Sequence, residues 1–117
     1  MTDECDFCSE EVDDTASIYP SRDFVDLNLQ IAYRDAWVAC QTCAAFIRQY
    51  DRDQDSKAKD NLARRAIEKY RRKYGLRGAG SSELNAVLMI EVRALHDKFW
   101  EHRIGEPVPY STKQLRG

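Results

Sequence analysis

Four cysteines in two Cys-x-x-Cys pairs are the residues of this chain whose type and spacing could do chemistry. Cys5 and Cys8 form the first pair, Cys40 and Cys43 form the second, and 31 residues lie between the pairs. A two-residue spacer lets both sulfurs of a pair reach one tetrahedral ion, and two such pairs complete a four-thiolate shell. Zinc suits thiolates because it has no redox chemistry and makes few geometric demands. The spacing therefore predicts one structural Zn²⁺ bound by all four cysteines.

Other interpretations of the same cysteines are disulfides, an iron–sulfur cluster, a redox-active pair, or thiols that are merely buried. Disulfides conflict with a reducing compartment. A redox-active Cys-x-x-Cys usually accompanies a βαβ pattern, which this sequence does not have. Four thiolates can also bind an iron–sulfur cluster, although the sequence gives no sign of a surface for an electron-transfer partner. The sequence thus favours zinc and leaves iron open.

The rest of the sequence lacks the patterns of a catalytic centre. It has no Gly-rich phosphate loop, nucleophile elbow or His-Glu-x-x-His motif. His96 and His102 are six residues apart, which places them on different faces of a helix, so that they cannot chelate one metal. Asp51, Asp53 and Asp55 alternate as in a calcium loop, but the glycine and the distal glutamate of that loop are missing. We therefore predict that the protein is not an enzyme.

Short strands and a helix start must position the two cysteine pairs. Apolar, β-prone stretches at 18–20, 23–29, 31–33 and 37–39 predict one or two short hairpins between the pairs, with a turn at 34–35. From Gln41 onward, the apolar residues recur every three or four positions, which predicts a helix. The second cysteine pair would then lie where free backbone N–H groups and the positive end of the helix dipole face the anionic sulfurs.

Two longer helices are predicted after the first. Residues 57–74 combine an apolar stripe with a basic face, and three glycines follow them. The last helix should run from Ser81 or Ser82 to about Arg103. Its apolar residues cover more than one face, so this helix is either central to the core or shared with another chain. The aromatic residues expected in the core are Tyr19, Phe24, Trp37, Phe46, Phe99 and Trp100.

Charge is distributed unevenly along the chain, although the net charge is only −2. Residues 1–14 carry seven acidic and no basic side chains, and residues 57–77 carry nine basic and two acidic ones. These segments either form two surfaces for partners, remain solvated, or attract each other within the fold. Basic side chains that could contact nucleic-acid phosphates are Arg64, Arg65, Lys69, Arg71, Arg72, Lys73 and Arg77.

These elements predict an α+β protein, with an N-terminal four-cysteine zinc knuckle and short hairpins followed by two or three helices. Residues 1–56 would form the zinc-binding module, residues 57–104 a helical part packed on it, and residues 105–117 a C-terminal tail. No apolar run approaches the roughly 20 residues of a membrane span, and the acidic N-terminus does not resemble a signal peptide. We expect a cytoplasmic monomer or homodimer without membrane contact.

A zinc knuckle, a hairpin region and a second cysteine pair on the first helical turn resemble the treble-clef zinc finger. Within that class, CDFC at 5–8, YPSRDF at 19–24 and WVACQTCAAFI at 37–47 are similar to small zinc-finger proteins of actinobacteria and their phages. The likeness covers about residues 5–65. It implies a treble-clef-like or zinc-ribbon-like fold with the four cysteines as ligands. Those proteins mostly have no assigned activity, so the resemblance implies none.

Together, these observations predict a zinc-stabilised binding or regulatory protein that acts by macromolecular contact. Its partner is expected to be a protein, and a transcription or nucleic-acid machine of the phage or actinobacterial type is the place to look for it. One alternative is direct nucleic-acid binding through the basic helix at 62–77. A weaker alternative is a redox- or metal-responsive regulator.

Overall fold

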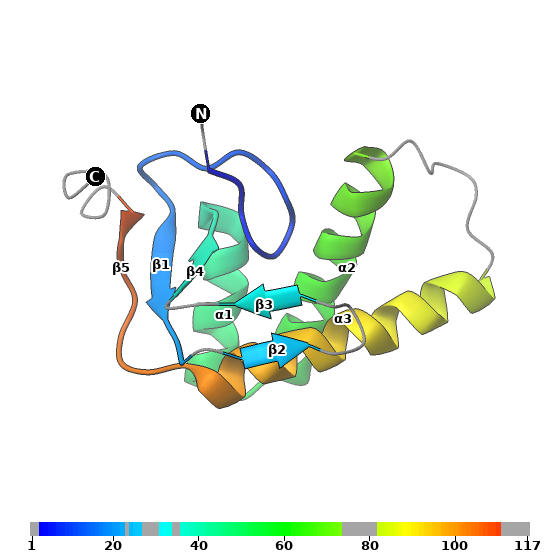
Figure 1. Cartoon of the computed structure of the whole chain (residues 1–117). Coiled ribbons are helices and arrows are strands. Elements are labelled where there is room, and N and C mark those ends of the chain that lie inside the picture. The colour runs from blue at the N-terminus through cyan, green and yellow to red at the C-terminus, as the bar shows by residue number, and fades with distance from the viewer. Residues whose placement is uncertain (1–2, 23, 27–30, 34–35, 74–81, 111–117) are drawn as a thin grey trace.

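A computed structural model describes residues 3–22, 24–26, 31–33, 36–73 and 82–110 of the chain. These residues form an α+β fold in which short strands precede three helices (Figure 1). The predicted fold class is therefore confirmed. In chain order, the elements are β1 (Ser17–Pro20), β2 (Phe24–Asp26), β3 (Ile31–Tyr33), β4 (Ala36–Ala39), α1 (Gln41–Asp53), α2 (Ser56–Lys73), α3 (Ser82–His102) and β5 (Val108–Pro109).

The strands between the cysteine pairs form nested antiparallel pairs. β1 pairs with β4 in a register that runs from Ser17 opposite Ala39 to Pro20 opposite Ala36. β2 pairs with β3 as a separate two-stranded hairpin. The chain thus leaves β1, makes the β2–β3 hairpin and returns as β4, which brings residue 40 back beside the N-terminal segment. The predicted hairpins are present, whereas the predicted turn at 34–35 lies outside the described residues.

The segment after α3 differs from the expected loose tail. β5 pairs with the free side of β1, with Ile18 opposite Val108, and it completes a sheet of order β4-β1-β5. Tyr110 is buried, and its backbone N–H donates to the carbonyl of Ala16 at 3.1 Å. Gly105, at φ 71°, adopts the left-handed conformation that lets the chain turn back after α3. The tail prediction was therefore wrong for residues 108–110, and residues 111–117 lie outside the described part.

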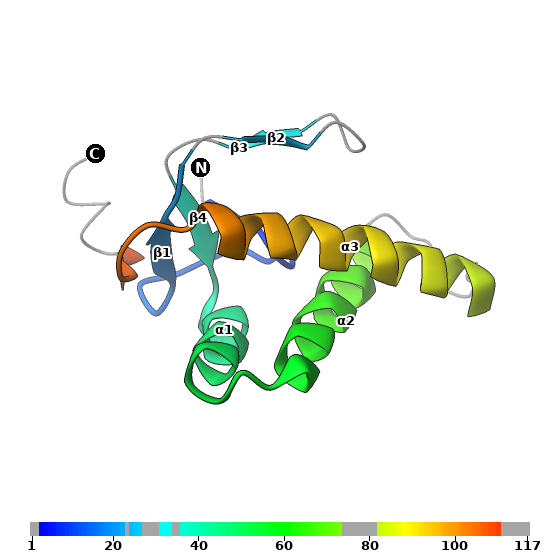
Figure 2. The ribbon, with the colours of Figure 1, turned by 90° about the horizontal axis from the view of Figure 1, so that it is seen from below.

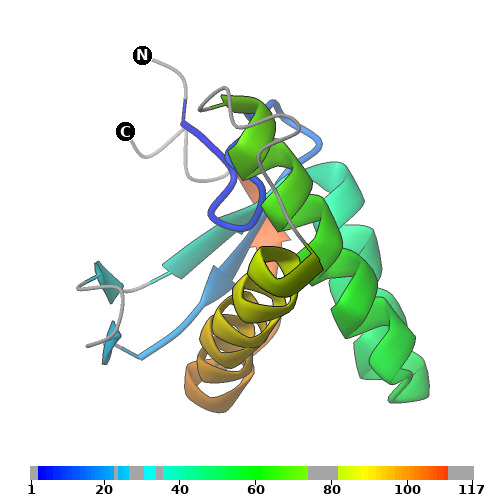
Figure 3. The ribbon, with the colours of Figure 1, turned by 90° about the vertical axis from the view of Figure 1, so that its right-hand side faces the viewer.

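The three helices lie on one side of the β2–β3 hairpin. In two perpendicular views, α3 lies between that hairpin and the α1–α2 pair (Figures 2 and 3). α1 and α2 are joined at Gln54, which adopts a left-handed φ of 53° and donates its N–H to the carbonyl of Tyr50. α1 begins at Gln41 as predicted, and α2 and α3 begin and end within one residue of the predicted positions.

An aromatic cluster joins the N-terminal knuckle to β4 and α3. The Phe7 ring lies 5.0 Å from the Trp37 ring and 5.1 Å from the Phe99 ring, measured between centroids. Tyr19 packs edge-to-face on Phe99 at 5.5 Å. Of the predicted core aromatics, Tyr19, Trp37 and Phe99 are buried. Phe46 and Trp100 are partly buried and pack against the core, whereas the Phe24 side chain is not described. The sequence analysis did not place Phe7 in the core.

Polar contacts tie α3 to the other two helices. Asp51 at the end of α1 accepts hydrogen bonds from Trp100 Nε1 at 3.0 Å and from Arg103 at 2.6 Å. Lys59 of α2 pairs with Asp97 of α3 at 3.0 Å. These contacts connect the C-terminal part of α3 and the residue after it to α1 and α2.

The N-terminal half of α3 extends past α2 (Figures 1 and 2). Val87 and Ile90 on this half are 53% and 70% exposed, whereas Leu95 and Phe99 further along the helix are buried. Among the described side chains of α3, those buried in the core therefore lie in its second half. The sharing of the first half with another chain stays a prediction. No helix in the described ranges combines the length and the apolarity needed to cross a membrane.

Candidate metal centre

Two backbone turns bring the cysteine pairs together. In the first, the Ser9 N–H donates to the Cys5 carbonyl at 2.9 Å, and Ser9 takes a positive φ of 66°. In the second, Cys40 is the N-cap of α1, and Cys43 lies in the first helical turn. Asp6 links the turns, because its N–H donates to the Val38 carbonyl at 2.8 Å and its carboxylate accepts from the Val38 N–H at 2.6 Å.

The four sulfur atoms lie close enough together to surround one metal ion. All four lie within 4.8 Å of one another, and the sulfurs of Cys8 and Cys40 are 3.7 Å apart. A tetrahedral ion with metal–sulfur bonds of about 2.3 Å requires sulfurs separated by about 3.8 Å. The cysteines are between 0% and 8% exposed. The four predicted ligands are thus gathered at one point, where they could hold a metal ion.

Backbone amides point at the cluster from both turns. The N–H groups of Phe7 and Cys40 donate to the Cys5 sulfur at 3.4 and 3.3 Å. The Cys43 N–H donates to the Cys40 sulfur at 3.5 Å. Such hydrogen bonds strengthen when the acceptor is an anion. The helix start therefore supplies donors to the second pair, as the sequence predicted, and the knuckle supplies them to the first.

Contacts among the four sulfurs shift the pKa values of the thiols in opposite directions. Hydrogen bonding to the Cys40 sulfur raises the pKa of both Cys5 and Cys43 above the ordinary thiol value. The reciprocal contacts, first that with Cys43, lower the pKa of Cys40. For Cys8, the Cys40 contact raises the pKa, but contacts with Cys43 and Cys5 outweigh it and lower the pKa to about 7. A divalent ion would replace the shared protons, because metals bind thiolates and release protons.

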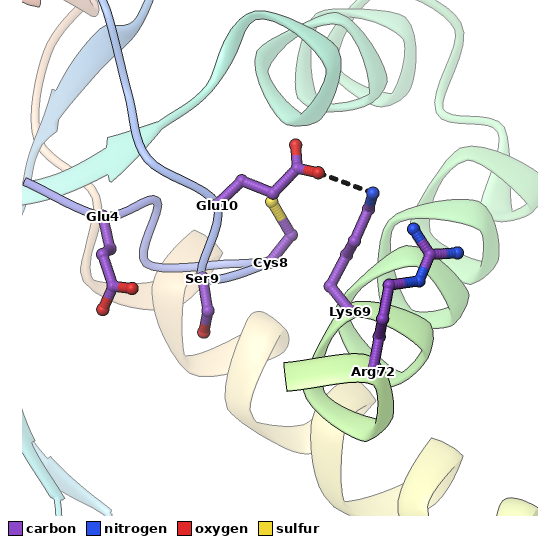
Figure 4. Close-up of a pocket in the computed structure, with 6 residues that line it drawn as sticks. All are labelled: Glu4, Cys8, Ser9, Glu10, Lys69 and Arg72. Atoms are coloured by element: carbon purple, nitrogen blue, oxygen red, sulfur yellow. Dashed lines mark ion pairs between the residues drawn. The ribbon is translucent and has the colours of Figure 1, made fainter. Parts of the chain in front are cut away.

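Two basic side chains of α2 reach the cluster together with one acid from the knuckle. The Arg65 guanidinium lies 2.8 Å from the Glu10 carboxylate and 3.8 Å from the Cys40 sulfur. Lys69, one turn further along α2, pairs with the same carboxylate at 2.5 Å (Figure 4). The Lys69 hydrogen bond and the Arg65 charge lower the pKa of Glu10. Acidic and basic segments therefore attract each other within the fold here, which was one of the interpretations of the charge pattern.

Among the described residues, the candidate nucleic-acid side chains are not gathered into one free surface. Arg65 and Lys69 are engaged by Glu10, and Arg72 pairs with Glu68 at 2.7 Å on the exposed side of α2. Arg64 is exposed and Arg71 is half-buried. The Lys73 side chain and Arg77 lie outside what the structure describes.

A small open pocket of about 300 Å³ lies between the knuckle and the end of α2 (Figure 4). Acidic and basic side chains both line it, and the Glu10–Lys69 ion pair crosses one side. It therefore has no excess charge for an anion or a cation. Its lining residues are Glu4, Cys8, Ser9, Glu10, Lys69 and Arg72.

Sequence reasoning found the cysteines but missed Glu10, Arg65 and Lys69 as neighbours of the cluster. The available signals were an acid two residues after Cys8 and two basic residues four apart on one helix face. Comparisons with protein-family models, curated proteins and solved structures found no match to the chain. The site is therefore interpreted from its own geometry.

Proposed function

We propose that the four cysteines hold one structural Zn²⁺. The observation that carries this proposal is the set of four buried cysteines whose sulfurs all lie within 4.8 Å of one another. A site with four protein ligands leaves no open position for water or substrate, which is the property of structural rather than catalytic zinc. Because such a site does not exist in the unfolded chain, metal binding contributes directly to folding.

We further propose that the protein is a non-enzymatic binding module whose partner is another protein. Val87 and Ile90 support a protein partner, because they leave α3 with an exposed apolar face and apolar anchors are typical of protein interfaces. Engagement of Arg65 and Lys69 by Glu10 weakens the competing case for nucleic acid. The resemblance to phage and actinobacterial zinc fingers directs the search toward a transcription or nucleic-acid machine.

The metal is tested by elemental analysis of protein purified under reducing conditions. We expect one zinc per chain, and we expect Cys40→Ser to lose both the metal and the folded state. Visible absorption by the purified protein would instead identify iron–sulfur ligation. A wild-type chain without metal, or a Cys40→Ser chain that folds normally, would contradict structural zinc.

The partner is tested by capture from a nuclease-treated lysate of an actinobacterium, the host that the resemblance implies. We expect Val87→Glu with Ile90→Glu to lose a protein that the wild type retains. The matched control, Arg64→Glu with Arg72→Glu, changes exposed charges on α2 and should keep that protein. Retention of the wild type on DNA or RNA at low salt, lost only in the arginine variant, would favour nucleic-acid binding instead.

A further inference from the structure

Arg65 stands out because it approaches the sulfur of the most exposed cysteine. Cys40 is 8% exposed, whereas the other three cysteines are at most 2% exposed. The Arg65 guanidinium lies 3.8 Å from the Cys40 sulfur, and its side chain is 20% exposed. It therefore lies beside the sulfur of the cysteine that is most exposed to solvent.

The position of this guanidinium is fixed by two further side chains. Glu10 accepts a hydrogen bond from Arg65 at 2.8 Å, and Lys69 pairs with the other oxygen of Glu10 at 2.5 Å. Glu10 lies in the loop that follows Cys8, so the arrangement joins α2 to the knuckle as well as to α1. A planar guanidinium can serve a carboxylate and a sulfur together because its donors point in several fixed directions.

The negative charge that four thiolates would leave on a metal-bound cluster explains why a cation beside it would be stabilising. Four thiolates around a divalent ion carry a formal charge of −2, and removing that charge from water is costly unless cations lie near. Arg65 and Lys69 add two positive charges and Glu10 adds one negative charge beside the sulfurs. Partners of metal ligands typically change metal affinity by 10- to 100-fold when they are removed.

We propose that Arg65 is a positioning residue of the metal centre, which keeps the Cys40 thiolate bound to the ion and shields it from electrophiles. This inference rests on the proposed metal site and deepens it. Glu10 and Lys69 act one step further out by holding the guanidinium in place. An Arg65 that only joined α2 to the knuckle would stabilise the fold without changing the bonding or reactivity of the sulfur.

The experiment compares wild type with Arg65→Met, Arg65→Lys and the matched control Arg64→Met on the same turn of α2. Zinc affinity is measured by chelator competition. The sulfur–metal charge-transfer band is recorded with Co²⁺ in place of zinc, and zinc release is timed during alkylation by N-ethylmaleimide. In that reaction the sulfur adds to the maleimide double bond, a proton from water completes the product, and the ion is released.

We expect Arg65→Met to weaken zinc affinity by about 10- to 100-fold, to shift the cobalt charge-transfer band to lower energy and to release zinc faster. The band should shift because a sulfur without its donor gives up electron density more readily. Arg65→Lys, which keeps the charge, should fall between Arg65→Met and wild type, and Arg64→Met should match wild type. If Arg65→Met does not fold, the Arg65→Lys spectrum and release rate decide the question.

The proposal is overturned if the Arg65 variants keep the wild-type cobalt band and release rate, even when they unfold more easily. Arg65 would then only form an ion pair with Glu10 that stabilises the fold, and the proposed metal site would be unaffected. A wild-type chain that binds neither zinc nor cobalt would instead overturn the proposed function, so the two failures are distinguishable.

Discussion

His96 is a polar residue of α3 that is buried in the aromatic core, where it packs against Phe7 of the knuckle. It is 1% exposed, and its ring lies 5.2 Å from the ring of Phe7. Its Nδ1 has no hydrogen-bond partner among the described residues. Burial lowers the pKa of His96 to about 3, although the charge of Asp97 opposes this shift. The His96 imidazole of the folded protein is therefore neutral at pH values at which the same imidazole in the unfolded chain binds a proton.

This histidine should make the folded state sensitive to mild acid. At pH values between the folded pKa of about 3 and the ordinary value of 6.5, His96 binds a proton in the unfolded chain but not in the folded chain. Stability is therefore lost as pH falls below about 6.5, with a limiting slope of about 1.4 kcal/mol per pH unit. We expect zinc-saturated His96→Leu to lose less stability than wild type between pH 6.5 and 5.5 in urea unfolding.

His102 provides the control for this measurement, because it lies on the same helix and is not buried. His102→Gln should keep the pH dependence of the wild type. An identical pH dependence in wild type and His96→Leu would show that the buried imidazole does not cause it and would point to the thiolates of the metal site.

The two halves of α3 differ in how far their apolar side chains are buried. Leu95 and Phe99 belong to the buried cluster that also contains Phe7 and Trp37, whereas Val87 and Ile90 are more than half exposed. A hydrophobic side chain contributes to stability in proportion to the area that folding removes from water. One helix therefore combines a half that supports the core with a half that remains available for contact.

Truncation of one residue from each half should separate these roles. Leu95→Ala should lower the free energy of unfolding by about 2–5 kcal/mol, because it leaves a cavity in the core. Ile90→Ala should change it by no more than about 0.5 kcal/mol, as expected of a surface substitution. Both values come from urea unfolding of the zinc-loaded protein at low concentration. A large loss in Ile90→Ala that grows with protein concentration would mean that a second copy covers this face.

At the scale of the whole molecule, the chain is closed by a contact between its two ends. The Tyr110 hydroxyl donates to the Asp3 carboxylate at 2.5 Å, and β5 adds the third strand beside β1. The metal site, the sheet and the aromatic cluster share one continuous set of buried residues that includes Cys5, Phe99 and Tyr110. A substitution that breaks the contact between Asp3 and Tyr110 should therefore lower the stability of the whole fold.

The contact between the ends can be measured by a double-mutant cycle. Tyr110→Phe and Asp3→Asn should each lower the free energy of unfolding by about 1 kcal/mol, which is typical of a hydrogen bond. Because both changes disrupt the same bond, the double variant should lose less than the sum of the single losses. Additive losses would indicate that the hydroxyl and the carboxylate do not interact in solution.

The sequence predicted the parts of this fold that depend on neighbouring residues. The cysteine spacing, the start of α1 at Gln41 and the amphipathic pattern of α2 are local, and the structure has each where it was expected. The missed features join distant residues. Arg65 meets Glu10 across 55 residues of sequence, and Tyr110 meets Asp3 across 107. Local patterns carry no information on such pairs, so the charge segments and the tail could not be assigned.

The late position of β5 has a consequence for synthesis on the ribosome. Proteins are made from the N-terminus at roughly 5–20 residues per second, and early segments can fold before later ones emerge. Both cysteine pairs and α1 precede residue 54, so a nascent chain could bring the four sulfurs together while α3 is still in the exit tunnel. β1 would meanwhile present an unpaired edge until residues 108–109 arrive. Ribosome-bound intermediates should therefore be most prone to aggregation between those two events.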